Sequence, residues 1–299
     1  MAVILLAAAG FAWNIMRWHS FTHTQPKNTL PFQYDFSVDG RMQEASNADE
    51  SSSPYWWLSS GGYFTLWNGY GSTVQNELKN SDTWRKRYAF SNPGETDAGA
   101  HPQNIFRLLT KSTWSDVTQE ALLRMNRYNI SPDPHRSESN GVLLISRYQD
   151  QHTLYYGGLR VDGNAVIKKK LNGAYYTLAL EKVFSGTYHR RSQPSLLPNG
   201  TWIGLKFETK NAGNGRVLLR LYADVGNTGT WTLVATADDD GSTHGTAITG
   251  IGRGGIRTDF MDVDIDTYRA EALGATSTAD ENTPAHTRQF TYEKAPTLP

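Results

Sequence analysis

Basic, amide and aromatic side chains recur at alternate positions of several predicted strands. Arg124, Asn126 and Tyr128 share one face of a strand, because side chains in a strand repeat with a period of two. A cation or an amide beside a uronate carboxylate acidifies the C5 proton of the sugar. A tyrosine or histidine can then remove that proton, and a tyrosine can protonate the leaving oxygen. This set of residues therefore predicts β-elimination on an acidic glycan.

Roles within this hypothesis follow from the residue types. Arg124 and Asn126 are expected to lie near Arg107 and to neutralise the carboxylate. Tyr156 is the expected proton-transfer residue, and His189 is the alternative base in a loop. The cationic and aromatic residues predicted to bind the substrate are Arg107, Tyr128, Arg147, Arg160, Lys168, Lys170 and Tyr188. Any one of them could instead be a solvated side chain that covers apolar neighbours, so the hypothesis depends on the cluster.

The elements that must position these residues include an antiparallel meander over residues 139–180. Its apolar runs are separated by turn sequences at residues 149–152, 162–164 and 172–173. Asp-Gly and Asn-Gly accept the positive φ of tight turns, so these are strong hairpin signals. A three-residue loop at 162–164 predicts Leu159 opposite Ile167 and Tyr156 opposite Lys170. One face is then core, and the other carries Tyr156, Arg160, Lys168 and Lys170.

Short apolar runs closed by Gly and Asn-Gly continue along most of the chain. Residues 119–130 lack helical apolar spacing and predict a strand that ends before Ser131-Pro132. Almost no segment reads as an amphipathic helix. The pattern predicts an all-β fold, a two-sheet antiparallel jelly-roll sandwich, over residues 32–270, with a polar tail over residues 271–299. Arg124, Arg147 and Tyr156 are expected on its concave sheet.

Composition sets the compartment and limits the partners. The chain has 29 basic and 29 acidic residues, which argues against nucleic acid as a partner. It has no cysteine, which excludes disulfides and thiolate metal sites. The apolar run over residues 2–16 is too short for a stable membrane span and predicts an export signal, with a buried structural helix as the alternative; residues 1–31 then form signal and linker. We expect a secreted or cell-envelope monomer.

Three stretches resemble the concanavalin A-like, laminin-G-like jelly-roll superfamily. They read SNGVLLISRYQD with LYYGGLRVDG, TWIGLKFETK with GRVLLRLYAD, and GRGGIRTDFMDVDIDTY. The resemblance implies a carbohydrate-active protein, because the superfamily includes lectins, carbohydrate-binding modules, laminarinase-type hydrolases and jelly-roll polysaccharide lyases. Such lyases often have Gln-x-His where this chain has Arg124-Met125-Asn126. The missing histidine leaves Tyr156 or His189 as the expected base.

An acidic run, Asp262-Val263-Asp264-Ile265-Asp266, offers a different interpretation. Two carboxylates on one strand face could serve a glycoside hydrolase, although the laminarinase pattern uses glutamates in mid-chain. Many members of the fold also hold calcium between the first and last strands, which makes Asp39 and Asp266 candidate ligands. No cofactor is expected to be required.

The leading hypothesis is a secreted polysaccharide lyase whose partner is an acidic polysaccharide. A non-catalytic carbohydrate-binding or lectin-like domain is the alternative, and a glycoside hydrolase comes third. The sequence contains no nucleophile elbow, phosphate-binding loop or zinc-ligand spacing.

Overall fold

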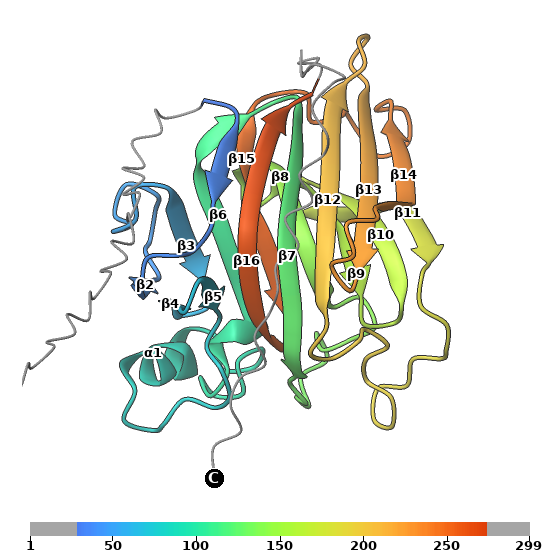
Figure 1. Ribbon diagram of the computed structural model, residues 1–299. Helices are drawn as coiled ribbons and strands as arrows, with labels where there is room; N and C mark the ends of the chain where they lie inside the picture. The colour runs from blue at the N-terminus through green and yellow to red at the C-terminus, as the bar shows by residue number, and fades with distance from the viewer. Residues whose placement is uncertain (1–28, 274–299) are drawn as a thin grey trace, which may run out of the picture.

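The chain folds into two antiparallel β-sheets that pack against each other around a common apolar core (Figure 1). The computed structural model describes residues 29–273. The prediction of an all-β, two-sheet jelly-roll sandwich is confirmed. The predicted export signal and most of the predicted polar tail lie outside the described residues.

The larger sheet has nine strands. In spatial order, the path of the sheet runs β14 (Thr232–Asp239), β13 (Val217–Val225), β12 (Trp202–Asn211), β7 (Val117–Tyr128), β16 (Met261–Ala272), β5 (Tyr70–Ser72), β4 (Tyr63–Trp67) and β2 (Gly40–Gln43), and β1 (Phe32–Tyr34) pairs with β16. The strand predicted over residues 119–130 is therefore confirmed as β7.

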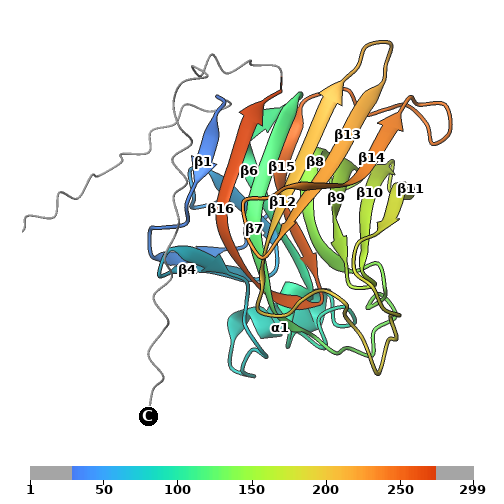
Figure 2. The ribbon, with the colours of Figure 1, turned by 45° about the vertical axis from the view of Figure 1, so that its right-hand side comes forward.

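The smaller sheet has seven strands and contains the predicted meander. Its order is β11 (Ala174–Lys182), β10 (Asn164–Leu171), β9 (Thr153–Arg160), β8 (Gly141–Asp150), β15 (Gly252–Asp259), β6 (Ile105–Trp114) and β3 (Trp56–Ser60). At one edge of the sandwich β11 lies across from β14 of the larger sheet (Figure 2).

The core lies between the facing sides of the two sheets. Trp56 and Phe106 from the smaller sheet and Phe207 from the larger sheet are fully buried there. Full burial of such a side chain stabilises the fold by roughly 1.5–3 kcal/mol. The core side of β10 also holds a buried ion pair, with Lys169 Nζ 2.8 Å from Asp239 Oδ2.

A short helix, α1 (Thr83–Ser91), and a 3-10 turn, η1 (Pro102–Asn104), lie beside the strands at one end of the sandwich (Figure 1). Asp82 caps α1, because its carboxylate accepts a 2.7 Å hydrogen bond from the Trp84 backbone N–H. The helix buries Tyr88, whose hydroxyl accepts from the Gly61 N–H at 2.9 Å. This contact fixes α1 against the β3–β4 turn.

The register of the meander differs from the predicted one. Lys168 lies opposite Tyr156, and Leu159 lies opposite Ala165. The prediction that placed Lys170 opposite Tyr156 is wrong by two positions, because the connecting loop spans residues 161–163 rather than 162–164. A shift of two residues leaves every side chain on its predicted face. Tyr156, Lys168 and Lys170 therefore share the outer face of the smaller sheet, away from the core.

Candidate functional site

A groove opens on the outer face of the smaller sheet. Its main part encloses about 510 Å³. A smaller hollow of about 200 Å³ continues from it and shares five of its lining residues. We call the two together the outer groove; the main part is lined by Glu95, Asn104, Ile105, Pro134, His135, Ser137, Ser139, Asn140, Leu143, Tyr156, Lys168, Tyr175, Arg257, Asp259 and Phe260, and the smaller hollow adds Ser60, Phe106 and Arg107.

An apolar cluster reaches the outer groove through Leu143 and Tyr156. This second hydrophobic cluster covers the outer face of β6, β8, β9 and β10, and it is separate from the main core. Its members are Leu109, Leu143, Ile145, Tyr148, Leu154, Tyr156 and Val166, with Trp57 packed against them. The charged groups of the groove lie beside Leu143 and Tyr156, and charge interactions at a partly buried site are stronger than in open water.

Arg257 and Asp259 form an ion pair on β15, with Nε 2.9 Å from Oδ1. Burial raises the pKa of the Asp259 carboxyl, and the opposing effect of the Arg257 charge does not cancel the increase. Burial alone would lower the pKa of Arg257, but Asp259, Tyr156 and Tyr175 outweigh it and raise that pKa. The guanidinium therefore keeps its positive charge beside the two tyrosines.

Two tyrosines in the groove have pKa values that are shifted in opposite directions. Burial raises the pKa of Tyr156, which is only 5% exposed. Burial would also raise the pKa of Tyr175, but the positive charges of Arg257 and Lys170 lower it below the usual phenol value. Their ring centroids are 6.3 Å apart in an edge-to-face arrangement. Tyr156 therefore holds its proton more tightly than a free phenol does, and Tyr175 releases its proton more readily. Such a pair is suited to acid–base chemistry.

Lys168 adds a second cation to the lining of the groove. Burial lowers the pKa of its ammonium, and the positive charges of Arg160 and Arg257 lower it further. Its position opposite Tyr156 places it on the same face as the two tyrosines. Lys170 lies at the edge of the groove, with Nζ 4.5 Å from the Tyr175 ring centre. Cations therefore flank Tyr175 within the groove and at its edge.

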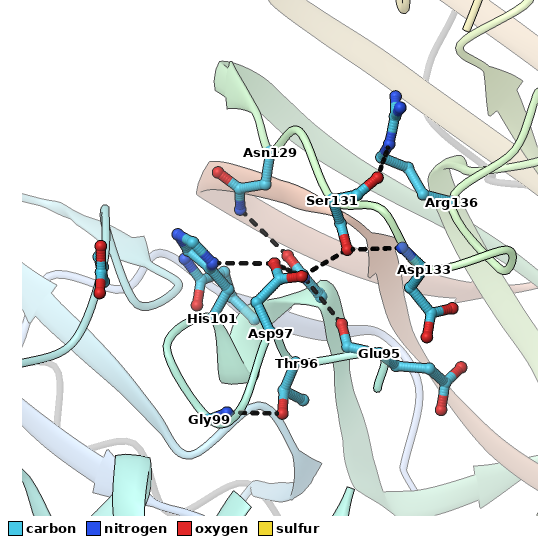
Figure 3. Close-up of polar contacts among 12 residues, drawn as sticks. Glu95, Thr96, Asp97, Gly99, His101, Asn129, Ser131, Asp133 and Arg136 are labelled. Atoms are coloured by element: carbon cyan, nitrogen blue, oxygen red, sulfur yellow. Dashed lines mark hydrogen bonds and ion pairs between the residues drawn. The ribbon is translucent and has the colours of Figure 1, made fainter. Parts of the chain in front are cut away.

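Two loops, residues 92–104 and 129–136, form one wall of the groove and are joined by Asp97 (Figure 3). Asp97 Oδ2 lies 3.1 Å from His101 Nδ1, and Oδ1 accepts from Ser131 Oγ at 2.5 Å. Asp97 itself has φ of +51°, and Gly99 has φ of +81°. A side chain at Gly99 would also meet Arg85 O at 2.0 Å, so the tight turn that presents Asp97 requires glycine there.

The same network orients His135 toward the groove. Ser131 Oγ accepts from the Asp133 N–H at 3.2 Å, and Asp133 Oδ1 lies 2.9 Å from His135 Nδ1. When Nδ1–H donates to Asp133, Nε2 keeps a free lone pair. His135 Nδ1 is also 4.0 Å from Glu95 Oε1, and both side chains line the groove. His135 is therefore a second candidate base.

The structure brings some of the predicted site residues together. Tyr156 and Lys168 line the main part of the groove, and Arg107 lines the smaller hollow. The Arg107 Nε donates to Ser59 Oγ at 2.7 Å, and its guanidinium lies 5.4 Å from the Tyr148 ring centre. Tyr156 and Lys168 thus lie on the outer face of the meander, as predicted, and Arg107 lies outside the meander on β6.

The predicted proximity of Arg124 and Asn126 to Tyr156 is wrong. They lie on β7 of the larger sheet, whereas Tyr156 lies on β9 of the smaller one. Arg124 pairs with Asp264 at 2.6 Å on the outer side of its own sheet, and Asn126 Nδ2 donates to Gln75 Oε1 at 3.1 Å. The apolar core separates them from the groove, so they cannot neutralise a sugar held there.

Arg147 is also absent from the outer face, contrary to prediction. It adopts φ of +50° at a bulge in β8, where the register with β9 is interrupted. The bulge turns the side chain inward, where it is 1% exposed and lies 3.1 Å from Asp116 Oδ1. Arg147 donates as well to Ile248 O at 2.6 Å, which makes it a structural residue.

Four further predicted residues do not line the groove. Arg160 is paired with Asp162 at 2.8 Å at the end of β9. The Tyr128 hydroxyl donates to Asn140 Oδ1 at 3.2 Å, behind the groove wall, and burial raises its pKa. Burial raises the pKa of Tyr188 as well, while His189 is exposed, with Nδ1 2.9 Å from Ser192 Oγ. None of these four predicted ligands is a lining residue.

The two predicted calcium ligands do not form a recognisable metal site. Asp39 Oδ1 accepts from the Asn68 N–H at 3.2 Å, and Asp266 Oδ1 accepts from Thr267 Oγ1 at 3.1 Å. Burial raises the pKa of Asp266. Within residues 29–273 no group of three or more His, Cys, Asp or Glu side chains could hold a metal ion. Calcium binding stays a prediction, which melting curves with and without a chelator would test.

Several groove residues were missed by the sequence-based prediction. Arg257 and Asp259 lie two positions apart on β15 and so share a face. The prediction considered only the acidic run that follows them, residues 262–266. Tyr175 stands in a predicted strand, and its period-two neighbours could have placed it on a face. Glu95 and His135 lie in loops, and no spacing in the sequence brings them to the sheet. Loop geometry alone determines their position.

In the part of the chain that the structure describes, no helix has the length and apolar character needed to cross a membrane. Comparison by sequence finds neither a matching protein-family model nor a matching curated protein.

Comparison with solved structures finds other two-sheet sandwiches. Carbohydrate-binding module CBM66 from Bacillus subtilis has a TM-score of 0.43 and 13% identity, over 73% of this chain and 95% of that one. The GH43 protein BlXynB from Bacillus licheniformis has 0.44 and 14%, over 83% of this chain and 40% of that one. A β-1,3-1,4-glucanase (lichenase) from a mouse hindgut metagenome has 0.44 and 8%, over 81% and 99%. These similarities concern the sandwich architecture, and the site must be argued from its own residues.

Proposed function

We propose that the outer groove binds an acidic polysaccharide and cleaves it by β-elimination. One observation carries the proposal: Tyr156 and Tyr175 line the same groove with ring centroids 6.3 Å apart, and the Arg257 guanidinium lies 5.6 Å from the Tyr156 ring centre. The opposite directions of their pKa shifts support it. Separated pKa values on neighbouring groups are characteristic of acid–base pairs. The groove is open and elongated by its smaller hollow, as a polymeric substrate requires.

Each step of the reaction can be assigned to a group in the groove. Arg257 and Lys168 neutralise the uronate carboxylate, which acidifies the proton on the adjacent carbon. Tyr175, as phenolate, removes that proton. The electron pair of the broken C–H bond becomes the new carbon–carbon double bond. The bond from the sugar to the glycosidic oxygen breaks, and the Tyr156 hydroxyl protonates the departing oxygen. His135 is the alternative base, since its Nε2 is free beside the same lining residues.

The test is an absorbance assay for the unsaturated product. The protein is incubated separately with alginate, glucuronan, pectate and glycosaminoglycans, and ultraviolet absorbance is followed with time. We expect an increase with one of these polymers and a loss of that increase in Tyr175→Phe. The matched control is Tyr176→Phe on the same strand, because Tyr176 stacks on His244 at 4.8 Å and is not a groove-lining residue. No absorbance change with any polymer would refute the lyase proposal.

Non-catalytic carbohydrate binding is a second candidate function, and the same groove favours it. Half-exposed Tyr175 and the cations around it can hold a sugar without any proton transfer. Retention of the protein on an acidic polysaccharide, without new absorbance and without new reducing ends, would identify a binding module. New reducing ends without absorbance would identify a hydrolase.

Export from the cytoplasm is proposed together with this function, because polysaccharides of this kind are met outside the cell. The apolar run over residues 2–16 supports it. Sequencing the N-terminus of the protein isolated from its host tests the proposal, and an intact Met1 on cytosolic protein would refute it.

A further inference from the structure

A separate hollow, which is not part of the outer groove, lies beside the groove along the β3–β4 hairpin. Ser60 at the end of β3 lines the groove, Tyr63 at the start of β4 lines this hollow, and only two glycines separate them in the chain. We call it the hairpin hollow. It encloses about 340 Å³ and is lined by Arg41, Gln43, Tyr63, Asp82, Thr83, Trp84 and Arg87.

The hairpin hollow contains two guanidinium groups that are held in place by aromatic rings. The guanidinium of Arg41 lies 4.1 Å from the Tyr63 ring centre, and that of Arg87 lies 4.5 Å from the Trp84 ring centre. Both arginine side chains are exposed, and a cation–π contact with a ring face leaves the N–H groups able to donate. Within residues 29–273 neither guanidinium has a hydrogen-bond acceptor or a carboxylate partner.

Other lining groups add donors to the hairpin hollow. The Trp84 Nε1–H donates to Gln43 Oε1 at 2.7 Å, which orients the Gln43 amide and leaves its NH₂ as a donor. Burial raises the pKa of Tyr63, so its hydroxyl keeps its proton. Asp82 supplies the opposing charge, but its carboxylate is engaged by the Trp84 N–H at the helix cap. Two cations against one anion leave the lining positive.

We propose that the hairpin hollow binds the oxyanion of an acidic sugar, a carboxylate or a sulfate ester, as a second site separate from the outer groove. A guanidinium can donate two hydrogen bonds to one oxyanion, and charge-assisted hydrogen bonds of this type are the strong ones; Arg41 and Arg87 bring two such groups to the lining of one hollow. The oxyanion is inferred from the hollow itself, whereas the choice of a sugar rests on the function proposed above.

Two sites on one protein would act together on a polymer. Once the groove holds one part of a polysaccharide, the hairpin hollow meets a second acidic unit at high effective concentration. The second site would therefore increase retention on the polymer without changing the chemistry of cleavage. Its contribution should also fall with added salt, because exposed charges are screened.

Affinity electrophoresis in gels containing polygalacturonate, carrageenan or neutral dextran tests the proposal. All proteins carry Tyr175→Phe so that the gel is not degraded, and the test variant adds Arg41→Gln and Arg87→Gln. The control adds Arg216→Gln and Arg220→Gln, which remove the same charge at and beside β13, far along the larger sheet from β2 and β4. We expect the apparent Kd of the test variant to rise about tenfold or more in a charged gel, with the control and the dextran gel unchanged.

The gel in which the difference appears identifies the oxyanion. Polygalacturonate carries carboxylates, and carrageenan carries sulfate esters without uronate. Equal retardation of the test and control variants in both charged gels would overturn the proposal, provided that melting curves show both to be folded. A protein that keeps Tyr175 and carries only Arg41→Gln and Arg87→Gln should turn over short oligosaccharides as fast as the unmodified protein does. The absorbance assay reports cleavage and the gels report the second site. Failure of one proposal can therefore be distinguished from failure of the other.

Discussion

Replacing Tyr175 by phenylalanine separates catalysis from binding. The change removes the hydroxyl and keeps the ring, which is 49% exposed and lies 4.5 Å from the Lys170 ammonium. An exposed cation–π contact contributes about 0.5–1 kcal/mol and survives in phenylalanine, so KM should change by less than about fivefold. Loss of a proton-transfer group lowers turnover by on the order of 10²–10⁴-fold, or about 2.7–5.5 kcal/mol in the barrier.

The assay is steady-state kinetics from the absorbance of the unsaturated product, measured as a function of pH. Turnover should rise with pH, because deprotonation of Tyr175 generates the base. Lys170 lowers the pKa of Tyr175, so Lys170→Met should move the rising limb to higher pH, and Lys170→Arg should restore it. A merely structural role for Lys170 would not move this limb.

Two results would refute the reasoning. If Tyr175→Phe keeps kcat within a few-fold of the unmodified protein, Tyr175 does not transfer the proton. If Tyr175→Phe is inactive but Lys170→Met leaves the pH limb in place, the tyrosine acts without the charge arrangement described above. Tyr176→Phe should match the unmodified protein in both measurements.

Further predictions concern residues in and around the site. His135→Ala tests the alternative base: with Tyr175 as the base, turnover should stay within about tenfold of the unmodified protein, whereas a loss of about 10²-fold or more would assign the proton transfer to His135. His189→Ala should leave turnover within about twofold, because His189 does not line the groove. Arg124→Ala should leave turnover within twofold, since its pairing with Asp264 lies on the larger sheet. Lys169→Met should lower the free energy of unfolding by about 3–5 kcal/mol in urea titrations, because it leaves the buried Asp239 carboxylate without its partner.

Faces within the meander could be predicted from the sequence because side-chain alternation depends only on neighbouring residues. Tyr156, Lys168 and Lys170 were placed on the correct face although their register was wrong by two positions. A shift of two preserves alternation, whereas a bulge does not. At Arg147 the bulge in β8 reverses the alternation of side chains, and the local sequence does not predict this bulge.

Assignment of strands to sheets could not be predicted in the same way. Arg124 and Tyr156 belong to strands of similar character, and only the pairing of β7 with β12 and β16 puts Arg124 on the larger sheet. Such pairings join residues far apart in the sequence, and they depend on the whole core. The loops that carry Glu95 and His135 are a second case, because hydrogen bonds around Asp97 determine their course.

Tyr175 lies on β11, the last strand of its sheet, which has a neighbouring strand on one side only. Edge strands of this kind open at a lower free energy than the rest of a domain, so local unfolding can remove the proposed base while the sandwich stays intact. A bound polymer that contacts β11 would oppose this opening. Amide hydrogens of residues 174–182 should therefore exchange faster than those of β9 in the free protein, and binding of substrate should slow them selectively. The free energy needed to order this strand would then be part of the affinity for the substrate.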